Sequence, residues 1–226
     1  MPLLLVLSLA CFSSALVIRL TDPLVTEIAR DFSADPGTVA LLASAFAFPY
    51  ALGQPILGPL ADTIGKARVI KACLAIVAAG MLAAALAPSL DLLFLGRALA
   101  GLAAGGVIPV SLALIGDRFE LHERQVALSR LLGAMLTGQL IGAIGAGTIG
   151  AAAGWRTVLG VGTGLVALAL VLTLVQLVPR AEVERPAFSL ARIRDAYAQV
   201  FANPRDRICY TAVFVERVCI SGNRPY

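Results

Sequence analysis

Six apolar runs, each close to the length needed to cross a lipid bilayer, constrain the fold of this chain more than any other feature. A helix needs about 20 residues to span the hydrocarbon core. The runs occupy residues 2–20, 39–60, 72–90, 92–116, 131–155 and 157–179. Apolar residues make up 59% of the chain and charged residues 14%, and a water-soluble domain of this size could not bury so much apolar surface. The sequence therefore predicts an all-α membrane protein with a bundle of six transmembrane helices.

The apolar runs are continuous, whereas the strands of a membrane β-barrel alternate between apolar and polar residues. We therefore reject an all-β interpretation. The connections between runs are short, so successive helices should be antiparallel neighbours. The cysteines at positions 11, 73, 209 and 219 follow no metal-binding spacing and suggest no disulfide framework. We expect neither a metal nor a cofactor.

Basic residues predict the orientation of the helices. Twelve Lys and Arg residues lie between the second and third runs, between the fourth and fifth runs, and after the sixth run, whereas four lie on or near the other side. The positive-inside rule places the basic side in the cytoplasm. We predict a multi-pass protein of the plasma (inner) membrane with a cytoplasmic N-terminus. The net charge of +4 then reflects topology, and we expect no nucleic-acid partner.

The composition changes after residue 179, so the chain divides into three parts. We interpret residues 1–179 as the six-span domain and residues 180–207 as a cytoplasmic linker. Leu190, Ile193 and Tyr197 fall on one helical face of this linker, which is typical of an amphipathic helix on the membrane surface; a solvated linker fits equally well. Residues 208–226 begin a seventh apolar span that charged residues interrupt, so we predict an incomplete span.

The segment between the second and third runs carries a motif, Gly-Pro-Leu-Ala-Asp-Thr-Ile-Gly-Lys-Ala-Arg, at residues 58–68. It resembles the loop signature of major facilitator superfamily transporters, although Thr63 and Ala67 stand where basic residues are common. The resemblance implies that this loop is a latch between two halves of a transporter. We assign a cytoplasmic gating role to Gly58, Asp62, Gly65, Lys66 and Arg68, with Asp117 as a further member of the charge cluster.

Further segments resemble the same family. Residues 93–101 read Leu-Phe-Leu-Gly-Arg-Ala-Leu-Ala-Gly and resemble its fourth-span motif, with Ala100 in place of Gln. Asp22-Pro23 resembles the outer end of the first span, and Gly154-Trp155-Arg156 resembles the entry to the sixth. The resemblance is closest to drug- and sugar-efflux permeases. It implies that the six spans form two inverted three-helix repeats and constitute the N-terminal half of a twelve-helix transporter fold.

The fifth run contains glycines at the spacing of a motif that exporters of this family often carry. It departs from that motif at three positions, because Ala146 and Ala151 each replace a glycine and Gly147 replaces the proline. Glycine lets a neighbouring helix approach closely, so packing alone could also explain the pattern. The pattern favours export only weakly. We assign to helix packing Gly101, Gly133, Gly142, Gly147 and Gly150.

Arg97 lies five residues inside the fourth run, about 8 Å below the outer boundary at 1.5 Å per residue. A central charge would cost roughly 2.5–3.5 kcal/mol on insertion scales. Its side chain either reaches back to the outer interface or faces a polar cavity, where it pairs with a substrate or with a carboxylate such as Asp22. The family resemblance implies proton coupling at Arg97.

Other polar groups near the membrane have similarly open roles. A carboxylate that alternates between an arginine and a proton would couple proton entry to a conformational change, and Asp22 could do so with Arg97 or Arg19. Asp22 could equally be a loop residue that precedes Pro23. Gln54 and Gln139 could bind a substrate or only a neighbouring helix. We include these residues, Arg97, Asp22, Arg19, Gln54 and Gln139, in a candidate substrate and proton-coupling cavity.

We hypothesise a secondary active transporter of a small solute, with proton-coupled efflux, present here as a truncated chain. Its partners would be the solute, protons, the bilayer, and either the missing C-terminal half or a second copy of the chain. A homodimer of six-span chains and a non-transporting assembly subunit are the alternatives. An enzyme is not expected, because the single histidine, His122, lies in a loop and no nucleophile–base pair can be assembled within the spans. The absence of a phosphate-binding motif argues against direct use of ATP.

Overall fold

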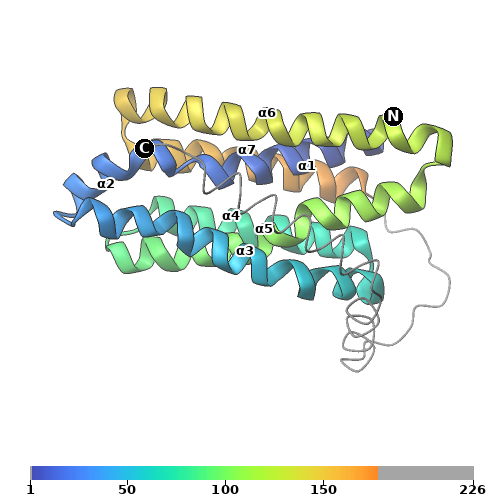
Figure 1. The fold of residues 1–226 in the computed structure, drawn as a ribbon, viewed down its shortest axis with the longest axis horizontal. Coiled ribbons are helices and arrows are strands. Elements are labelled where there is room, and N and C mark those ends of the chain that lie inside the picture. The colour runs from blue at the N-terminus through green and yellow to red at the C-terminus, as the bar shows by residue number, and fades with distance from the viewer. Residues whose placement is uncertain (1, 178–226) are drawn as a thin grey trace, which may run out of the picture. The chain divides into compact units, whose positions relative to one another are not determined.

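A computed structural model describes residues 2–177, whereas the predicted linker at 180–207 and the incomplete span at 208–226 lie outside the described residues. The described part is helical, with six helices long and apolar enough to cross a membrane (Figure 1). The elements are α1 (Pro2–Arg19), the 3₁₀ helix η1 (Asp22–Leu24), α2 (Val25–Asp31), α3 (Pro36–Ile64), α4 (Lys66–Ala85), α5 (Leu90–Arg118), α6 (Leu121–Ala153) and α7 (Trp155–Gln176). This arrangement confirms the prediction of an all-α bundle.

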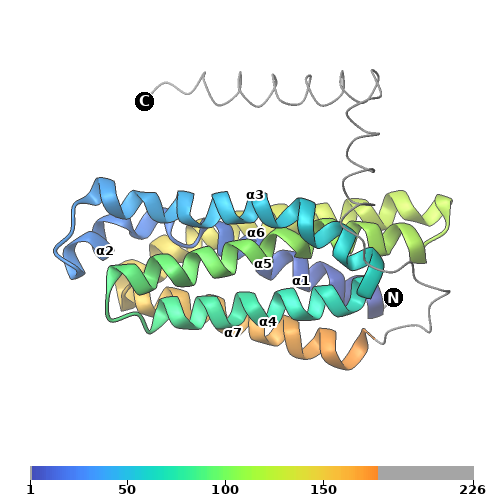
Figure 2. The same ribbon diagram turned by 90° about the horizontal axis from the view of Figure 1, so that it is seen from below.

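The packing follows two inverted repeats, one formed by α1, α3 and α4 and the other by α5, α6 and α7. The second helix of each repeat packs against the first helix of the other, so that α3 lies on α5 and α6 lies on α1. The third helices, α4 and α7, pack against each other. In Figure 1, α6 runs along the upper margin and α3 and α5 cross in the lower half, with α1 between them and α6; Figure 2 shows the same bundle from below. The predicted pair of three-helix repeats is therefore confirmed.

The bundle has two ends. The α2 end carries α2, the start of α3 and the α6–α7 junction. The Lys66 end carries the α3–α4 junction and the C-terminus of α5.

Several helices extend beyond the apolar runs. The third run was expected at 72–90, but α4 begins at Lys66 and residues 86–89 are not helical. Charged residues occupy the first turns of α4 and α6, where they continue the helix outside the apolar run, and α6 accordingly begins at Leu121 and not at 131. At the other end of the α4–α5 turn, Ser89 Oγ accepts a hydrogen bond from the Leu92 N–H at 3.4 Å. This cap starts a new helix.

The segment between the first and second apolar runs is folded and is not an irregular loop. It forms η1 and the short helix α2, and Leu24 and Ile28 are buried. Asp35 then caps α3, because its Oδ2 accepts a hydrogen bond from the Thr38 N–H at 3.0 Å. The segment therefore contacts α3 and α6 where it follows α1, and it holds these ends of the three helices in a defined arrangement.

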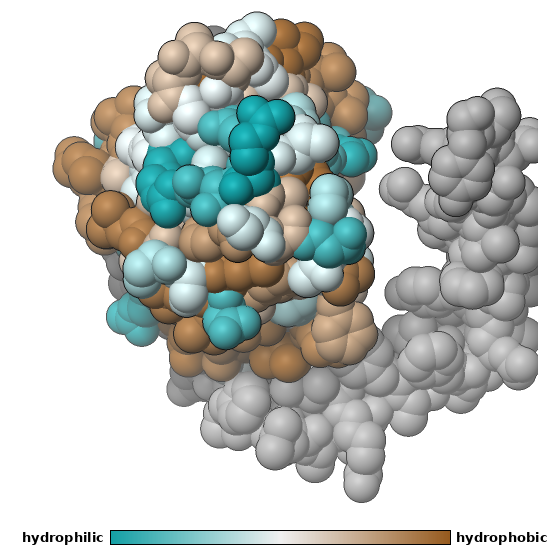
Figure 3. Space-filling model, turned by 90° about the vertical axis from the view of Figure 1, so that its left-hand side faces the viewer, coloured by the Kyte–Doolittle hydropathy of each residue, from teal (hydrophilic) through white to brown (hydrophobic). Residues whose placement is uncertain are grey.

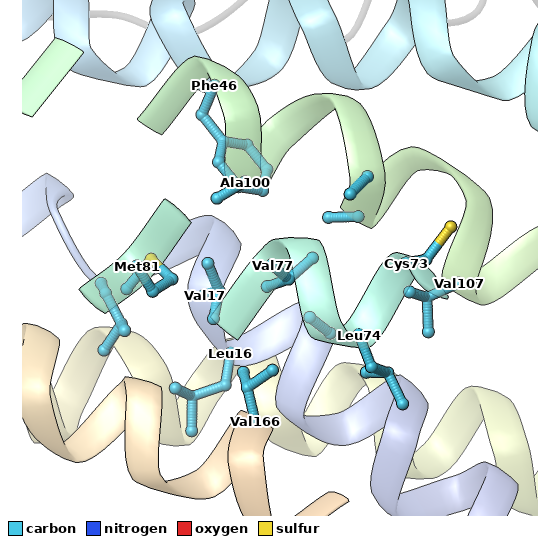
Figure 4. Packing of buried hydrophobic residues seen from close by; sticks show 14 of the residues in the cluster. Leu16, Val17, Phe46, Cys73, Leu74, Val77, Met81, Ala100, Val107 and Val166 are labelled. Carbon is cyan, nitrogen blue, oxygen red and sulfur yellow. The ribbon is translucent and has the colours of Figure 1, made fainter. Parts of the chain in front are cut away.

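Buried side chains from all six long helices and from α2 form the core of the described residues. Figure 4 shows Leu16 and Val17 of α1, Phe46 of α3, four residues of α4, Ala100 and Val107 of α5, and Val166 of α7 converging between the helices. Small residues occupy the closest approach: a Cβ at Gly80 of α4 would lie 2.8 Å from the Gly96 carbonyl oxygen of α5. Close contact of this kind is how helices associate in lipid.

Candidate functional site

Arg97 lies at the centre of the candidate site and is completely buried. Its Nη1 donates a hydrogen bond to the Val17 carbonyl oxygen at 3.0 Å and lies 3.8 Å from the Met81 sulfur. The guanidinium carbon lies 4.4 Å from the centre of the Phe46 ring. These three neighbours come from α1, α4 and α3, and Figure 4 shows them in the core. The side chain therefore does not reach back to the interface, as one of the two interpretations had required.

The Arg97 guanidinium is only partly satisfied. Its Nε and Nη2 atoms are buried and have no hydrogen-bond partner among the described residues. A buried charge is costly unless its donors are paired, so this arrangement is poorly suited to a purely structural role. Two donors remain open to an acceptor.

Asp22 is not the hydrogen-bonded partner of Arg97. It begins η1, and its Oδ2 lies 3.0 Å from Nη1 of Arg19 in an exposed ion pair. The two residues are three positions apart, so the local turn brings them together. Asp22 and Arg97 therefore do not form the expected pair. Arg97 binds the Val17 carbonyl oxygen, and Asp22 forms a surface ion pair with Arg19.

The two candidate glutamines lie on different helices that flank the bundle. Gln54 of α3 is exposed and interacts with the side chain of Tyr50. Gln139 of α6 is half-buried and makes no side-chain hydrogen bond within residues 2–177. The sequence analysis missed a polar contact between α1 and α5, where the Cys11 thiol meets the Ser111 hydroxyl. Single small polar residues in apolar runs were the only available signal for it.

The Lys66 end brings together part of the predicted gating cluster. Lys66 Nζ donates to Asp117 Oδ2 at the end of α5 and lies 3.5 Å from Asp62 Oδ1. Arg68 does not join this cluster, because its Nη1 donates to the Ile64 carbonyl oxygen at 3.4 Å. Lys66 therefore links the α3–α4 junction to α5.

The glycine between α3 and α4 has a conformational role. Gly65 has a φ of 105°, which residues with a side chain rarely adopt, so glycine permits an abrupt change of direction there. A Cβ at Gly58, by contrast, would meet nothing within 4 Å. Gly58 has no packing role in the described part of the chain.

The glycines assigned to helix packing divide into two groups. A Cβ at Gly101 would collide with the Phe46 carbonyl oxygen, one at Gly142 would lie 2.6 Å from the Leu16 carbonyl oxygen, and one at Gly150 would collide with Leu24. A Cβ at Gly133 would meet nothing within 4 Å, and one at Gly147 would only touch Pro23 at 3.8 Å. Within residues 2–177, therefore, only Gly101, Gly142 and Gly150 lie at a close helix contact, and a packing role for Gly133 and Gly147 stays a prediction.

A second polar cluster lies at the α2 end, where the sequence had shown only family landmarks. Glu27 Oε1 accepts a hydrogen bond from the Trp155 backbone N–H at 2.9 Å. Asp31 Oδ2 accepts one from Trp155 Nε1 at 3.1 Å and also pairs with Arg156. Figure 3 faces this end and shows hydrophilic residues gathered on it, bordered by hydrophobic sides. Acids in the first outer segment and the Trp-Arg pair were the sequence signal for this cluster.

Within residues 2–177 no group of three or more His, Cys, Asp or Glu side chains is placed to hold a metal ion. The chemistry of the site rests instead on a buried cation with open donors and on charge pairs at the two ends. Neither arrangement contains a nucleophile with a neighbouring base.

Relatives with known names resemble this chain over most of its length. It is 34% identical over 160 residues to the MFS-type transporter YwfA of Bacillus subtilis (strain 168), covering 69% of this chain and 38% of the relative. It is 32% identical over 182 residues to a protein named Triacylglyceride transporter of Mycolicibacterium hassiacum, covering 79% and 34%. It is 30% identical over 149 residues to the Efflux pump FUBT of Fusarium oxysporum, covering 66% and 25%. The chain thus matches well under half the length of these relatives.

The fold resembles that of a solved transporter. A crystal structure of the peptide transporter POT in complex with sulfate matches with a TM-score of 0.72 at 18% sequence identity, covering 99% of this chain and 47% of the transporter. The family profile described as Major Facilitator Superfamily matches residues 7–221. The chain belongs to the major facilitator superfamily.

Proposed function

We propose that this chain forms the N-terminal half of a secondary active transporter that exports a small solute in exchange for protons. The observation that carries the proposal is the match of nearly the whole chain to 47% of a solved transporter. A secondary transporter of this kind binds its solute between two halves, so a second half would complete the site. Family membership also means that the chain is not an enzyme.

The exposed faces of α3 and α6 support a missing partner. Large apolar side chains such as Phe48 and Leu140 are 69% and 64% exposed. These helices border the face on which α1 and α5 lie, and they do not pack on each other. A second half laid on this face would cover them and would enclose Tyr50 and Gln54 near the solute. The remaining apolar surface faces lipid.

Arg97 would couple proton movement to transport. Its open Nε and Nη2 donors can bind a carboxylate from the second half or from the solute when that carboxylate is ionised. Protonation removes the charge and releases the arginine. Such an exchange ties proton binding to a change in helix packing. The Asp22–Arg19 pair could receive the proton on the α2 side.

The orientation is also part of this proposal. The basic residues of the Lys66 end favour a cytoplasmic position for that end by the positive-inside rule, so the N-terminus would be cytoplasmic and the protein would lie in the inner membrane. The Asp62–Lys66–Asp117 cluster would then close the cytoplasmic side. Relatives named as an efflux pump and a triacylglyceride transporter support export and suggest an apolar solute.

The test uses inside-out membrane vesicles that contain the full chain and are acidified by respiration. Ethidium and a fluorescent triacylglycerol are added as probe solutes, and release of acridine-orange quenching reports proton efflux. We expect Arg97→Met to lose the solute-dependent signal, because the variant keeps the volume and removes the charge. Arg30→Gln is the matched control, since Arg30 is exposed and makes no side-chain contact with the candidate site.

The outcomes separate the parts of the proposal. A signal that Arg97→Met leaves unchanged would contradict the coupling role. If the chain alone gives no signal, it is co-expressed with the part of the Mycolicibacterium hassiacum relative that follows the matched region. Restored exchange supports the half-transporter, and continued absence of exchange with an assembled pair contradicts it.

A homodimer is the second candidate, because the same α3–α6 face could bind a second copy. Native mass spectrometry of the chain extracted in mild detergent would show the copy number. A dimer with solute-dependent exchange supports a symmetric transporter. A dimer without exchange, unaffected by Arg97→Met, would favour an assembly subunit.

A further inference from the structure

The cluster at the α2 end connects three separate parts of the chain. Asp31 at the end of α2 pairs with Arg156 in the first turn of α7. Arg156 Nη2 donates to the Ala87 carbonyl oxygen in the α4–α5 turn at 3.3 Å, and its guanidinium carbon lies 4.2 Å from the centre of the Trp155 ring. The cluster thus joins the first repeat to the second at one end of the bundle.

The α6–α7 junction has the same backbone design as the α3–α4 junction. Each junction is a single glycine with a positive φ, 105° at Gly65 and 85° at Gly154. Each glycine N–H binds the carbonyl four residues earlier, at Ala61 and Gly150. In both cases one helix ends and the next begins at the following residue.

The charged contacts at the two junctions also correspond. Lys66 follows Gly65 and binds Asp117 at the end of α5, the first helix of the other repeat. Arg156 follows Gly154 by two residues and binds Asp31 at the end of α2, which continues α1, the first helix of the other repeat. The inverted-repeat symmetry therefore relates the Lys66–Asp117 contact to the Arg156–Asp31 contact at the opposite end of the bundle.

We propose that Asp31, Trp155 and Arg156 form the inverted-repeat counterpart of the Lys66–Asp117 cluster and hold the two repeats together at the α2 end, independently of the Lys66 end. The importance of this contact for transport rests on the proposed function, whereas the holding role does not. The two repeats would then be held together by one charged cluster at each end, and the two clusters would be related by the inverted-repeat symmetry. Asp31, Trp155 and Arg156 become positioning residues, since none of them contacts the buried arginine.

The composition of the cluster explains why it exceeds a simple surface ion pair. Arg156 and Asp31 are each about half exposed, and an exposed ion pair alone contributes little. Trp155, however, is 2% exposed, and its indole and backbone N–H groups both depend on acids of α2. Loss of an acceptor would leave a buried donor unpaired, so opening of α2 also disturbs the start of α7.

Hydrogen exchange of the full chain in lipid nanodiscs tests the proposal without a solute or a proton gradient. We expect Arg156→Gln to raise amide exchange about fivefold, as a loss of about 1 kcal/mol produces, in residues 27–33 and 155–159. Exchange in residues 61–70 should stay at the wild-type rate. Lys66→Gln should give the reverse pattern, and Arg30→Gln, the control on the same short helix, should change neither region.

Two results would overturn the proposal: unchanged exchange at the α2 end in Arg156→Gln, or an equal increase at both ends. A charge-exchanged double variant, Asp31→Lys with Arg156→Glu, guards against general misfolding, because it should recover part of the protection at the α2 end. Failure to recover any protection also counts against the pairing. Since exchange is measured without transport, a silent vesicle assay together with the expected exchange pattern would contradict the proposed function alone.

Discussion

Helices α5 and α6 are both long, glycine-rich and apolar enough to cross a membrane, but they occupy very different environments. In their membrane-spanning windows, 67% of α5 is buried within the protein and 17% of α6. Helix α5 packs against α1, α3 and α4, whereas α6 packs mainly against α1 and α7. Apolar character therefore identifies a span but does not decide how much of it faces protein.

The difference has a direct consequence for polar residues. The interior position of α5 encloses Arg97 completely, so the charge depends on the few acceptors that neighbouring helices supply. Gln139 on α6 remains half-buried and is available to a partner. The central helix α5 thus carries the buried Arg97, whereas the flanking helix α6 has an exposed face that a partner could cover.

The two faces of α6 offer the test with the largest expected effect. Leu131 is 1% exposed and Leu136 is 56% exposed. We expect Leu131→Ala to destabilise the bundle by about 3 kcal/mol, because it removes packed atoms and leaves a cavity. Leu136→Ala should change stability by less than about 1 kcal/mol.

Unfolding by SDS, followed through the fluorescence of Trp155, the only tryptophan of the chain, measures both variants. Equal losses in the purified single chain would show that the outer face of α6 is packed and would remove the contrast with α5. A loss for Leu136→Ala that appears only after a second half or second copy is bound would locate the interface on α6.

A smaller effect is expected from a matched pair of glycines. Gly101→Ala on α5 would place a Cβ in collision with the Phe46 carbonyl oxygen, so α3 and α5 must move apart at a cost of about 1–3 kcal/mol. Gly133→Ala on α6 has open space and should stabilise its helix by roughly 0.5–1 kcal/mol, since alanine loses less backbone entropy. Thermal unfolding of the two variants should therefore shift in opposite directions. Shifts in the same direction would mean that helix propensity outweighs packing at Gly101.

The sequence was sufficient to predict the six helices and their order, because long apolar runs have few alternatives in a membrane, whereas the repeat structure was implied by the family resemblance. It was less informative about helix ends. Charged residues such as Lys66 and Arg124 lie inside helices, since a helix continues into the interface where water satisfies its side chains. Helix α2 was missed because its seven residues are too few for a clear pattern and are held by tertiary contacts.

The face of each glycine could have been predicted better. At 3.6 residues per turn, positions nine residues apart lie about 180° apart around a helix. Gly133 and Gly142 therefore cannot contact the same neighbour, and the structure places only Gly142 against α1. Motif spacing had grouped residues that helical geometry separates.

The environment of Arg97 could not be predicted from the sequence. Its acceptor, the carbonyl of Val17, is 80 residues away in the chain, and a backbone carbonyl carries no residue signature. A carboxylate was the expected partner of Arg97, but the local turn after α1 brings Asp22 into an ion pair with Arg19. Contacts between repeats require the packing of whole helices, which patterns within one run do not specify.

The smallest effect on stability is expected for Asp117, whose charge pairs the end of α5 with the start of α4. Asp117 pairs with Lys66, whereas Glu120, which precedes α6, pairs only with the exposed His122 at 3.5 Å. We expect Asp117→Asn to destabilise the bundle by about 0.5–1 kcal/mol, the upper range for an exposed pair, and Glu120→Gln to have no measurable effect. The difference should disappear near 1 M salt, where screening acts within about 3 Å. SDS unfolding at low and high salt measures this, and a salt-independent loss would mean that Asp117 stabilises α5 through packing and not through its charge.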